Sequence, residues 1–185
     1  MAATHDDWFY HTKVFSKKII LFYKHIQQQE AENKILKTGQ SIIPPDLIFN
    51  ITSQEVISKW GKPRCRFFHK NGNKNIEILF YRRSYVYENT LFQLQFFNDQ
   101  LFFAGIEVGK GLTSEESKIK MLTNFLPALI TDTFSKFTTL PVWTDVENNY
   151  LFVEDEVNTN ICFMNGMYAF EKLPLLEFEL LKASI

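Results

Sequence analysis

Alternation of apolar and polar residues in Leu91–Phe97 is the pattern that most constrains the fold. Side chains of a strand point to opposite faces in turn, so the apolar and polar residues separate: Phe92, Leu94 and Phe96 share one face, and Gln93 and Gln95 share the other. Asn98 and Asp99 then turn the chain into a second apolar run, Leu101–Val108. This pattern predicts an antiparallel pair with one face against a core and the other partly wet.

A short helix and a hairpin are predicted before this pair. Thr52 and Glu55 have the spacing of a capping box, which begins a helix that runs to Trp60. Gly61, Lys62 and Pro63 end the helix, and Cys65–His69 and Asn75–Arg83 then read as strands joined by a type I′ turn at Asn71-Gly72. Together these elements form a first helix-plus-meander unit.

The second half of the chain repeats this order. A second capping box, Thr113 to Glu116, opens a helix that reaches Phe134, and Pro127 is expected to kink or divide it. Asparagine-rich turns then separate four short strand candidates: Val142–Val146, Tyr150–Glu154, Asn160–Met164 and Met167–Glu171. A short apolar tail, Leu173 to Leu181, follows them.

Apolar residues recur every three or four positions from Asp6 to about Lys37, which predicts one long N-terminal helix. Gly39 ends it, and Pro44 and Pro45 favour an extended connector. The expected fold is therefore α+β, with an N-terminal helix (1–40) and two helix-and-antiparallel-sheet units (41–111 and 112–185) in one compact domain. The repeated order of elements is consistent with a structural duplication.

Composition excludes several classes of protein. The formal net charge of −1 argues against a nucleic-acid binder, which needs basic residues to neutralise phosphates. Cys65 and Cys162 lie far apart, outside any zinc-ligand spacing, and are expected to be reduced. The N-terminal apolar run, Ile19 to Tyr23, is much shorter than the roughly 20 residues of a membrane span. We therefore expect a cytoplasmic protein with no membrane partner.

No catalytic motif stands out. The four histidines do not form a close pair on a helix, and neither a phosphate-binding loop, a nucleophile elbow nor a zinc-protease motif occurs. The nineteen phenylalanines supply contact area but no reactive group. We therefore expect a protein that is not an enzyme and needs no cofactor or metal.

A basic and aromatic group between residues 59 and 87 is the first candidate binding surface. Trp, Tyr and Arg are enriched at the residues that dominate binding energy in protein interfaces. The candidate residues are Trp60, Arg64, Arg66, Phe68, Arg82, Arg83 and Tyr85. On strands, Arg64 and Arg66 share a face, whereas Arg82 and Arg83 point to opposite faces. The alternative is a solvated face of an aromatic-rich sheet.

An acidic group in the second half is the other candidate surface. Its members are Asp145, Glu147, Glu154, Asp155 and Glu156. Such a group can meet a basic partner, because complementary charge raises association rates. The alternative is again a solvated rim around hairpin turns.

The part of the first unit from Ile51 to Gly109 contains "SQEVISKWGKP", followed by paired strands and "LQFFNDQLFFAGI". On these motifs it resembles the β-lactamase-inhibitory proteins and the small outer-membrane assembly lipoproteins. This chain lacks a lipoprotein cysteine near its start, and its N-terminal helix is extra. The resemblance implies a binding module rather than an enzyme.

These observations favour a protein-binding function. We expect an inhibitor or immunity protein that neutralises a toxin or enzyme by covering its surface with a preorganised face. One alternative is a small-ligand or lipid-binding domain whose phenylalanine-lined cavity lies between sheet and helix. Another is a structural subunit that forms a homodimer through its N-terminal helix.

Overall fold

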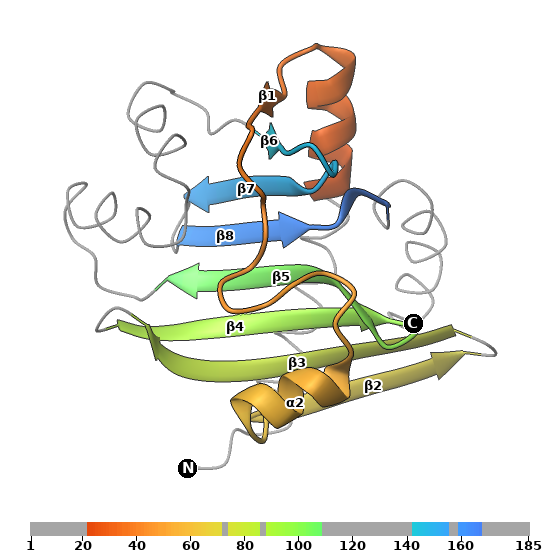
Figure 1. Cartoon of the computed structure of the whole chain (residues 1–185), viewed down its shortest axis with the longest axis vertical. Helices are drawn as coiled ribbons and strands as arrows, with labels where there is room; N and C mark the ends of the chain where they lie inside the picture. The colour runs from red at the N-terminus through yellow and green to blue at the C-terminus, as the bar shows by residue number, and fades with distance from the viewer. Residues whose placement is uncertain (1–21, 72–73, 86–87, 109–141, 156–158, 168–185) are drawn as a thin grey trace.

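A computed structural model describes residues 22–71, 74–85, 88–108, 142–155 and 159–167. In this part of the chain, two short helices accompany one eight-stranded, mostly antiparallel open sheet (Figure 1). The strands lie in the order β1-β6-β7-β8-β5-β4-β3-β2. The predicted α+β class is confirmed.

The elements of the first half are a helix at 22–31, then β1 (Leu36–Lys37), α2 (Ser53–Trp60), β2 (Cys65–Asn71), β3 (Lys74–Tyr85), β4 (Glu88–Phe97) and β5 (Gln100–Val108). Those of the second half are β6 (Trp143–Thr144), β7 (Tyr150–Asp155) and β8 (Thr159–Met164). The helix predicted from Thr113 to Phe134 lies outside the described residues, and so does nearly all of the strand predicted at Met167–Glu171.

The predicted meander is confirmed, because β2 to β5 pair antiparallel in sequence order. The turn after β4 uses two residues at positive φ, Asn98 at 48° and Asp99 at 63°. Both residue types tolerate this conformation better than most others. Asn98 Oδ1 also accepts a hydrogen bond from the Asn75 amide at 3.0 Å, which fixes this turn against β3.

Local signals also place α2 correctly. The amide of Glu55 donates to Thr52 Oγ1 at 3.2 Å, and the Thr52 amide donates to Glu55 Oε2 at 2.8 Å, so the predicted capping box is present. Gly61 follows the helix with φ 82°, a value that side chains other than glycine rarely adopt. The helix therefore stops where the sequence predicts.

Strands of the two expected units join in a single sheet. β8 pairs antiparallel with β5, β7 with β8, and β6 with β7, whereas β1 runs parallel to β6. The amide of Leu36 donates to Val142 O and that of Thr38 to Thr144 O, both at 2.9 Å. This pairing closes a contact between segments more than 100 residues apart in the sequence.

The predicted continuation of the N-terminal helix to Lys37 is wrong. The helix ends at residue 31, and Asn33 then takes φ 53°, a conformation typical of a residue just after a helix. Beyond it the chain is extended, because Leu36 and Lys37 pair with β6. Tertiary hydrogen bonds thus override the helical propensity of this segment. Residues 6–21 of the predicted helix lie outside the described part.

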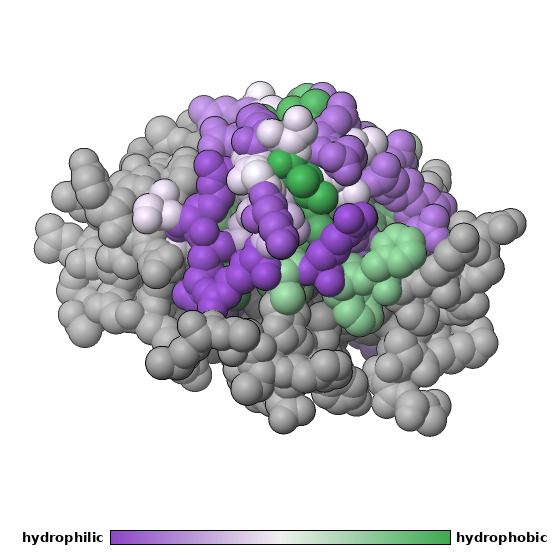
Figure 2. Space-filling view, turned by 90° about the horizontal axis from the view of Figure 1, so that it is seen from below, coloured by the Kyte–Doolittle hydropathy of each residue, from purple (hydrophilic) through white to green (hydrophobic). Residues whose placement is uncertain are grey.

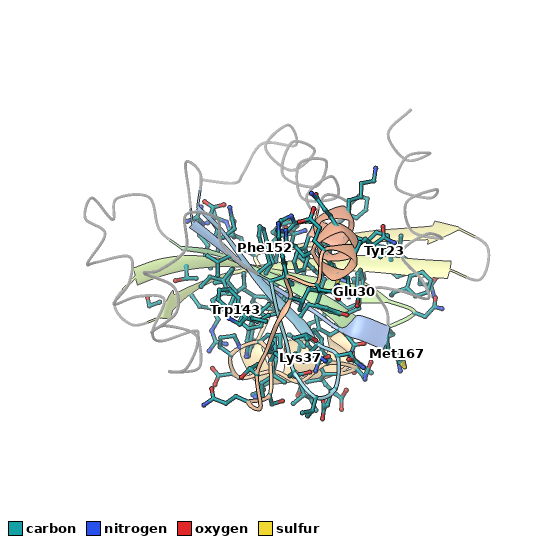
Figure 3. All side chains as sticks on the ribbon, turned by 90° about the horizontal axis from the view of Figure 1, so that it is seen from above. Tyr23, Glu30, Lys37, Trp143, Phe152 and Met167 are labelled. Atoms are coloured by element: carbon teal, nitrogen blue, oxygen red, sulfur yellow. The ribbon has the colours of Figure 1, made fainter. Side chains whose placement is uncertain are left out.

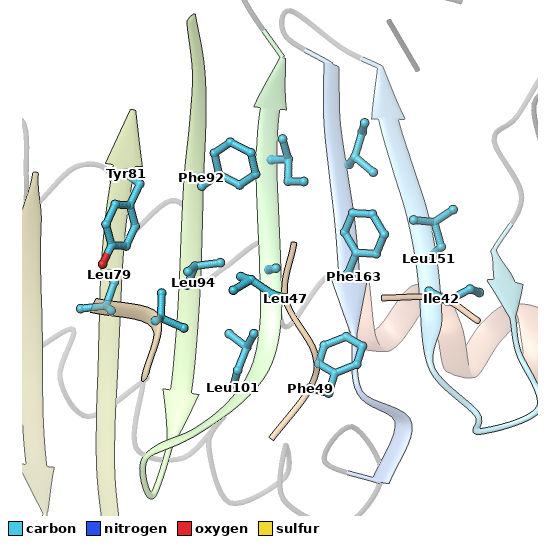
Figure 4. Close-up of a cluster of buried hydrophobic side chains, with 14 of the residues drawn as sticks. Ile42, Leu47, Phe49, Leu79, Tyr81, Phe92, Leu94, Leu101, Leu151 and Phe163 are labelled. Atoms are coloured by element: carbon cyan, nitrogen blue, oxygen red, sulfur yellow. The ribbon is translucent and has the colours of Figure 1, made fainter. Parts of the chain in front are cut away.

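Both faces of the sheet are covered by other elements. Figure 3 shows the helix at 22–31, with Tyr23 and Glu30, on one side of the sheet, and α2 with the connector before it (residues 38–52) on the other. We call these sides the helix face and the α2 face. On the α2 face, connector side chains pack over the strands (Figure 4). On the helix face, Phe22 stacks on Phe152 with ring centroids 5.2 Å apart.

The predicted partly wet face of β4 is therefore wrong. Gln93 and Gln95 lie on the helix face, and each is only 1% exposed. Both amide atoms of Gln93, and Nε2 of Gln95, find no hydrogen-bond partner in the described structure. A buried polar group without a partner loses its hydration and gains nothing in return. We therefore expect these glutamines to be less favourable for stability than apolar residues at the same positions.

Replacing Gln93 with Met should raise the free energy of unfolding by about 1–2 kcal/mol, because an apolar side chain of similar length has no hydrogen bonds to lose. Leu94→Ala, at the neighbouring core residue, is a control with the opposite expected effect: it should lower stability by about 2–5 kcal/mol. Urea denaturation of both variants measures the difference. Loss of stability in Gln93→Met would show that its amide has a partner.

His25 should make stability depend on pH. Its ring lies 5.0 Å from that of Phe152, and its Nε2 is buried without a hydrogen-bond partner in the described structure. Burial lowers the pKa of His25, although Glu32 opposes the shift. Below the ordinary histidine pKa of about 6.5 the unfolded chain therefore binds more protons than the folded one, so stability falls as the pH falls.

In His25→Phe this contribution should disappear. Between about pH 7.5 and 5, the free energy of unfolding should fall less for the variant than for the natural chain. Only the natural chain has a buried imidazole whose protonation favours the unfolded state. Thermal melts across this range measure the effect. The remaining histidines are the same in both chains, so parallel curves would mean that His25 titrates normally.

Candidate functional site

The edge of the sheet at β2 is the candidate site. β2 is the last strand in the sheet and, among the strands that the structure describes, pairs with β3 alone. Phe67 and Phe68, in the middle of β2, are 40% and 53% exposed. Figure 2, which views the molecule from the β2 end, shows a mainly hydrophilic described surface with hydrophobic residues set into it.

The two phenylalanines lie on opposite faces of the sheet. Phe68 is opposite Glu77, whose neighbours on the α2 face include Leu79 and Tyr81, whereas Phe67 is opposite Ile78 on the helix face. Phe68, but not Phe67, is among the binding residues that the sequence predicts. The available signal was the two consecutive aromatic residues, Phe67 and Phe68. Neighbouring side chains of a strand point to opposite faces, and both can stay exposed when the strand lies at the edge of the sheet.

Trp60 fixes the C-terminal end of α2 to the sheet. Its ring meets those of Tyr81 and Phe92 edge to face, with centroids 5.3 Å apart in both pairs. The Tyr81 hydroxyl donates to the carbonyl of Gly61 at 3.1 Å. Burial, followed by the negative charge of Glu77, raises the pKa of Tyr81, which keeps the hydroxyl protonated as a donor. Trp60 is thus half-buried and holds the helix in place.

The predicted basic residues divide between internal and external roles. Arg83 lies over the Trp60 ring, with Cζ 4.4 Å from the ring centroid, so its charge is engaged in a cation–π contact. Arg82 is exposed; as predicted, it and Arg83 lie on opposite faces. Arg64 is also exposed, although its amide donates to Phe80 O at 2.9 Å. Tyr85 ends β3, and its side chain lies outside the description.

Arg66 is not the unengaged surface charge that the sequence indicates. Its guanidinium forms an ion pair with Glu77, whose side chain is only 5% exposed. The register explains the pair, because Arg66 lies opposite Leu79, which makes Glu77 its diagonal neighbour on the same face. The Arg66 side chain remains 52% exposed, so this residue both neutralises a buried carboxylate and reaches solvent.

Within the predicted acidic group, Asp145 does not belong to an exposed surface. Asp145 is 5% exposed, and its carboxylate accepts from four donors in the described structure. They are the amides of Ile42 (2.7 Å), Glu147 (2.9 Å) and Asn149 (2.8 Å), and the Asn149 side chain (3.1 Å). Asp145 therefore ties the connector to the loop between β6 and β7.

Of the remaining residues in the predicted acidic surface, the side chain of Glu147 alone is described. Glu147 is exposed and accepts from Asn149 Nδ2 at 3.3 Å. Glu154 and Asp155 end β7, but their side chains lie outside the description, as does Glu156. Close packing supports the same loop, because a Cβ at Gly166 would overlap the carbonyl of Asn148.

The described residues contain no cluster of three or more histidine, cysteine or acidic side chains placed to hold a metal ion. Cys65 and Cys162 are both reduced, and burial raises the pKa of the Cys65 thiol. No helix in the described ranges is long and apolar enough to cross a membrane.

Charge reversal should affect stability differently at Arg66 and at Arg64. Arg66→Glu should lower stability by about 1–3 kcal/mol, because it places a second carboxylate beside buried Glu77. Arg64→Glu should change stability by no more than about 0.5 kcal/mol, as exposed substitutions usually do. In Arg66→Glu, adding Glu77→Gln should recover part of the loss. Equal stability of the two single variants by urea denaturation would contradict the ion pair.

Comparisons with known proteins add no relative. The chain matches no family model, no curated protein and no solved structure.

Proposed function

We propose that this chain is a protein-binding module that uses the β2 edge, and that it acts as an inhibitor or immunity protein by covering a toxin or enzyme. The supporting observation is the pair of exposed phenylalanines in a regular strand. The other exposed large hydrophobic residues of the described part lie outside the strands: Ile43, Ile48, Val146 and Met167.

Burial of these rings supplies a driving force for binding. Complete burial of a phenylalanine side chain contributes about 1.5–3 kcal/mol, and Phe67 and Phe68 are still 40% and 53% exposed. The cations Lys62, Arg64 and Arg82 are exposed near the Cys65 end of β2 and favour an acidic partner. Aromatic residues and arginine are enriched at interface hot spots.

Rigidity of the surroundings also supports this proposal. β2 pairs with β3 along its whole length, and Trp60, Tyr81 and the Arg66–Glu77 ion pair lock the adjacent α2 face. A preorganised surface loses little conformational entropy on association. Blocking a target by such a surface requires neither a reactive group nor a cofactor.

Affinity capture from the native cell tests the proposal. The natural chain should retain one stoichiometric partner, and Phe67→Ser with Phe68→Ser should lose it, because these rings form the contact. Ile48→Ser, which also removes an exposed apolar side chain, is the matched control and should keep the partner. Equimolar natural chain should lower the activity of the purified partner.

Each alternative gives a different result. Retention of the partner by the double phenylalanine variant would place the interface elsewhere. A partner whose activity does not change would exclude inhibition. A co-purifying lipid or metabolite, without a protein, would instead support the ligand-binding alternative. Thermal melts of the variants establish that they remain folded.

A further inference from the structure

The arrangement of Phe67 and Phe68 restricts how a partner can dock. One ring is exposed on the helix face and the other on the α2 face. A flat partner surface laid against either face can cover only one of them. A segment that runs alongside β2 reaches both, because side chains of a strand also alternate between the two faces.

The backbone of β2 is suited to such a segment. Along an edge strand, alternate residues direct their N–H and C=O groups away from the sheet. β2 has seven residues and no proline, and at about 3.3 Å per residue it offers room for a strand of similar length. β1, at the opposite edge, has only two residues. β2 is therefore the edge that can accept a strand.

We propose that an extended acidic segment of the partner protein adds to β2 as a further strand of the sheet. This inference rests on the proposed function and specifies its binding mode. Main-chain hydrogen bonds to β2 supply the pairing, and side chains on the two faces supply the selectivity.

Charge determines which segment fits. β2 reads CRFFHKN, which contains Arg66 and Lys70 but no acidic residue, and Arg64 precedes it. Antiparallel pairing of two copies of β2 would therefore bring like charges together, which is destabilising. Arg66 still exposes about half of its side chain beside Phe68 on the α2 face. Acidic side chains suit that face.

The helix face favours a different kind of side chain in the added strand. Cys65 and Phe67 lie there, opposite Phe80 and Ile78, so the rim is apolar. A complementary strand thus carries acidic residues on the α2 face and apolar residues on the helix face. Its sequence alternates acidic and apolar residues.

Synthetic peptides test this mode on the full chain. The probe is a fluorescent heptapeptide in which valine alternates with glutamate, matched to the length of β2. One control has the same sequence with the backbone nitrogens of two neighbouring central residues methylated, which removes donors from both of its edges. The second control replaces glutamate with lysine. Fluorescence anisotropy gives the affinities, and amide hydrogen exchange reports on β2.

The valine–glutamate peptide should bind at least about tenfold more tightly than either control, and its affinity should fall as salt rises from about 50 to 500 mM. It should also slow hydrogen exchange in residues 65–71. Arg64→Glu should weaken binding several-fold, and Phe67→Ser with Phe68→Ser should weaken it by about tenfold or more. Both variants spare the Arg66–Glu77 ion pair.

Four results would overturn the inference. Equal affinity for the methylated peptide, or unchanged exchange in β2, would exclude strand pairing. No binding at millimolar peptide would do the same. A chain that doubles its mass at micromolar concentration, with slowed β2 exchange in the absence of peptide, would make a second copy the occupant. Partner capture that still depends on Phe67 and Phe68 would keep the proposed function while this mode fails.

Discussion

Burial of both faces of the sheet is the constraint on which the rest of this structure depends. Aromatic and aliphatic side chains line the two faces, and each face is covered by a different segment: the connector and α2 on one side, the helix at 22–31 on the other. A sheet buried on one face only would leave a large apolar area in water. The named covering segments all come from residues 22–60, whereas the strands that they cover extend to residue 164.

With both faces covered, the edges are the accessible parts of the described sheet. β1, at one edge, is only two residues long, which is one of the ways in which natural sheets limit unwanted pairing. β2, at the other edge, is longer and carries exposed phenylalanines together with positive charge. The position of the candidate site thus follows from how the core is closed.

Several charged residues that look like surface groups are used inside the fold. Arg66 neutralises Glu77, Arg83 stacks on Trp60, and Asp145 accepts four hydrogen bonds. A charge that approaches the interior must find a partner, because its loss of hydration is unfavourable. Counting basic or acidic residues along the sequence therefore overestimates the charge available to a partner.

The sequence by itself determined the local structure: the meander from β2 to β5, the strands at β7 and β8, and the capping box that begins α2. These depend on alternation, turn residues and capping, all of which act over a few residues. Only the tertiary structure decided that the N-terminal helix ends at residue 31, that Gln93 and Gln95 are buried, and that Arg66 pairs with Glu77. Each depends on a partner distant in sequence, and no local pattern specifies which distant segment will cover a face or meet a charge.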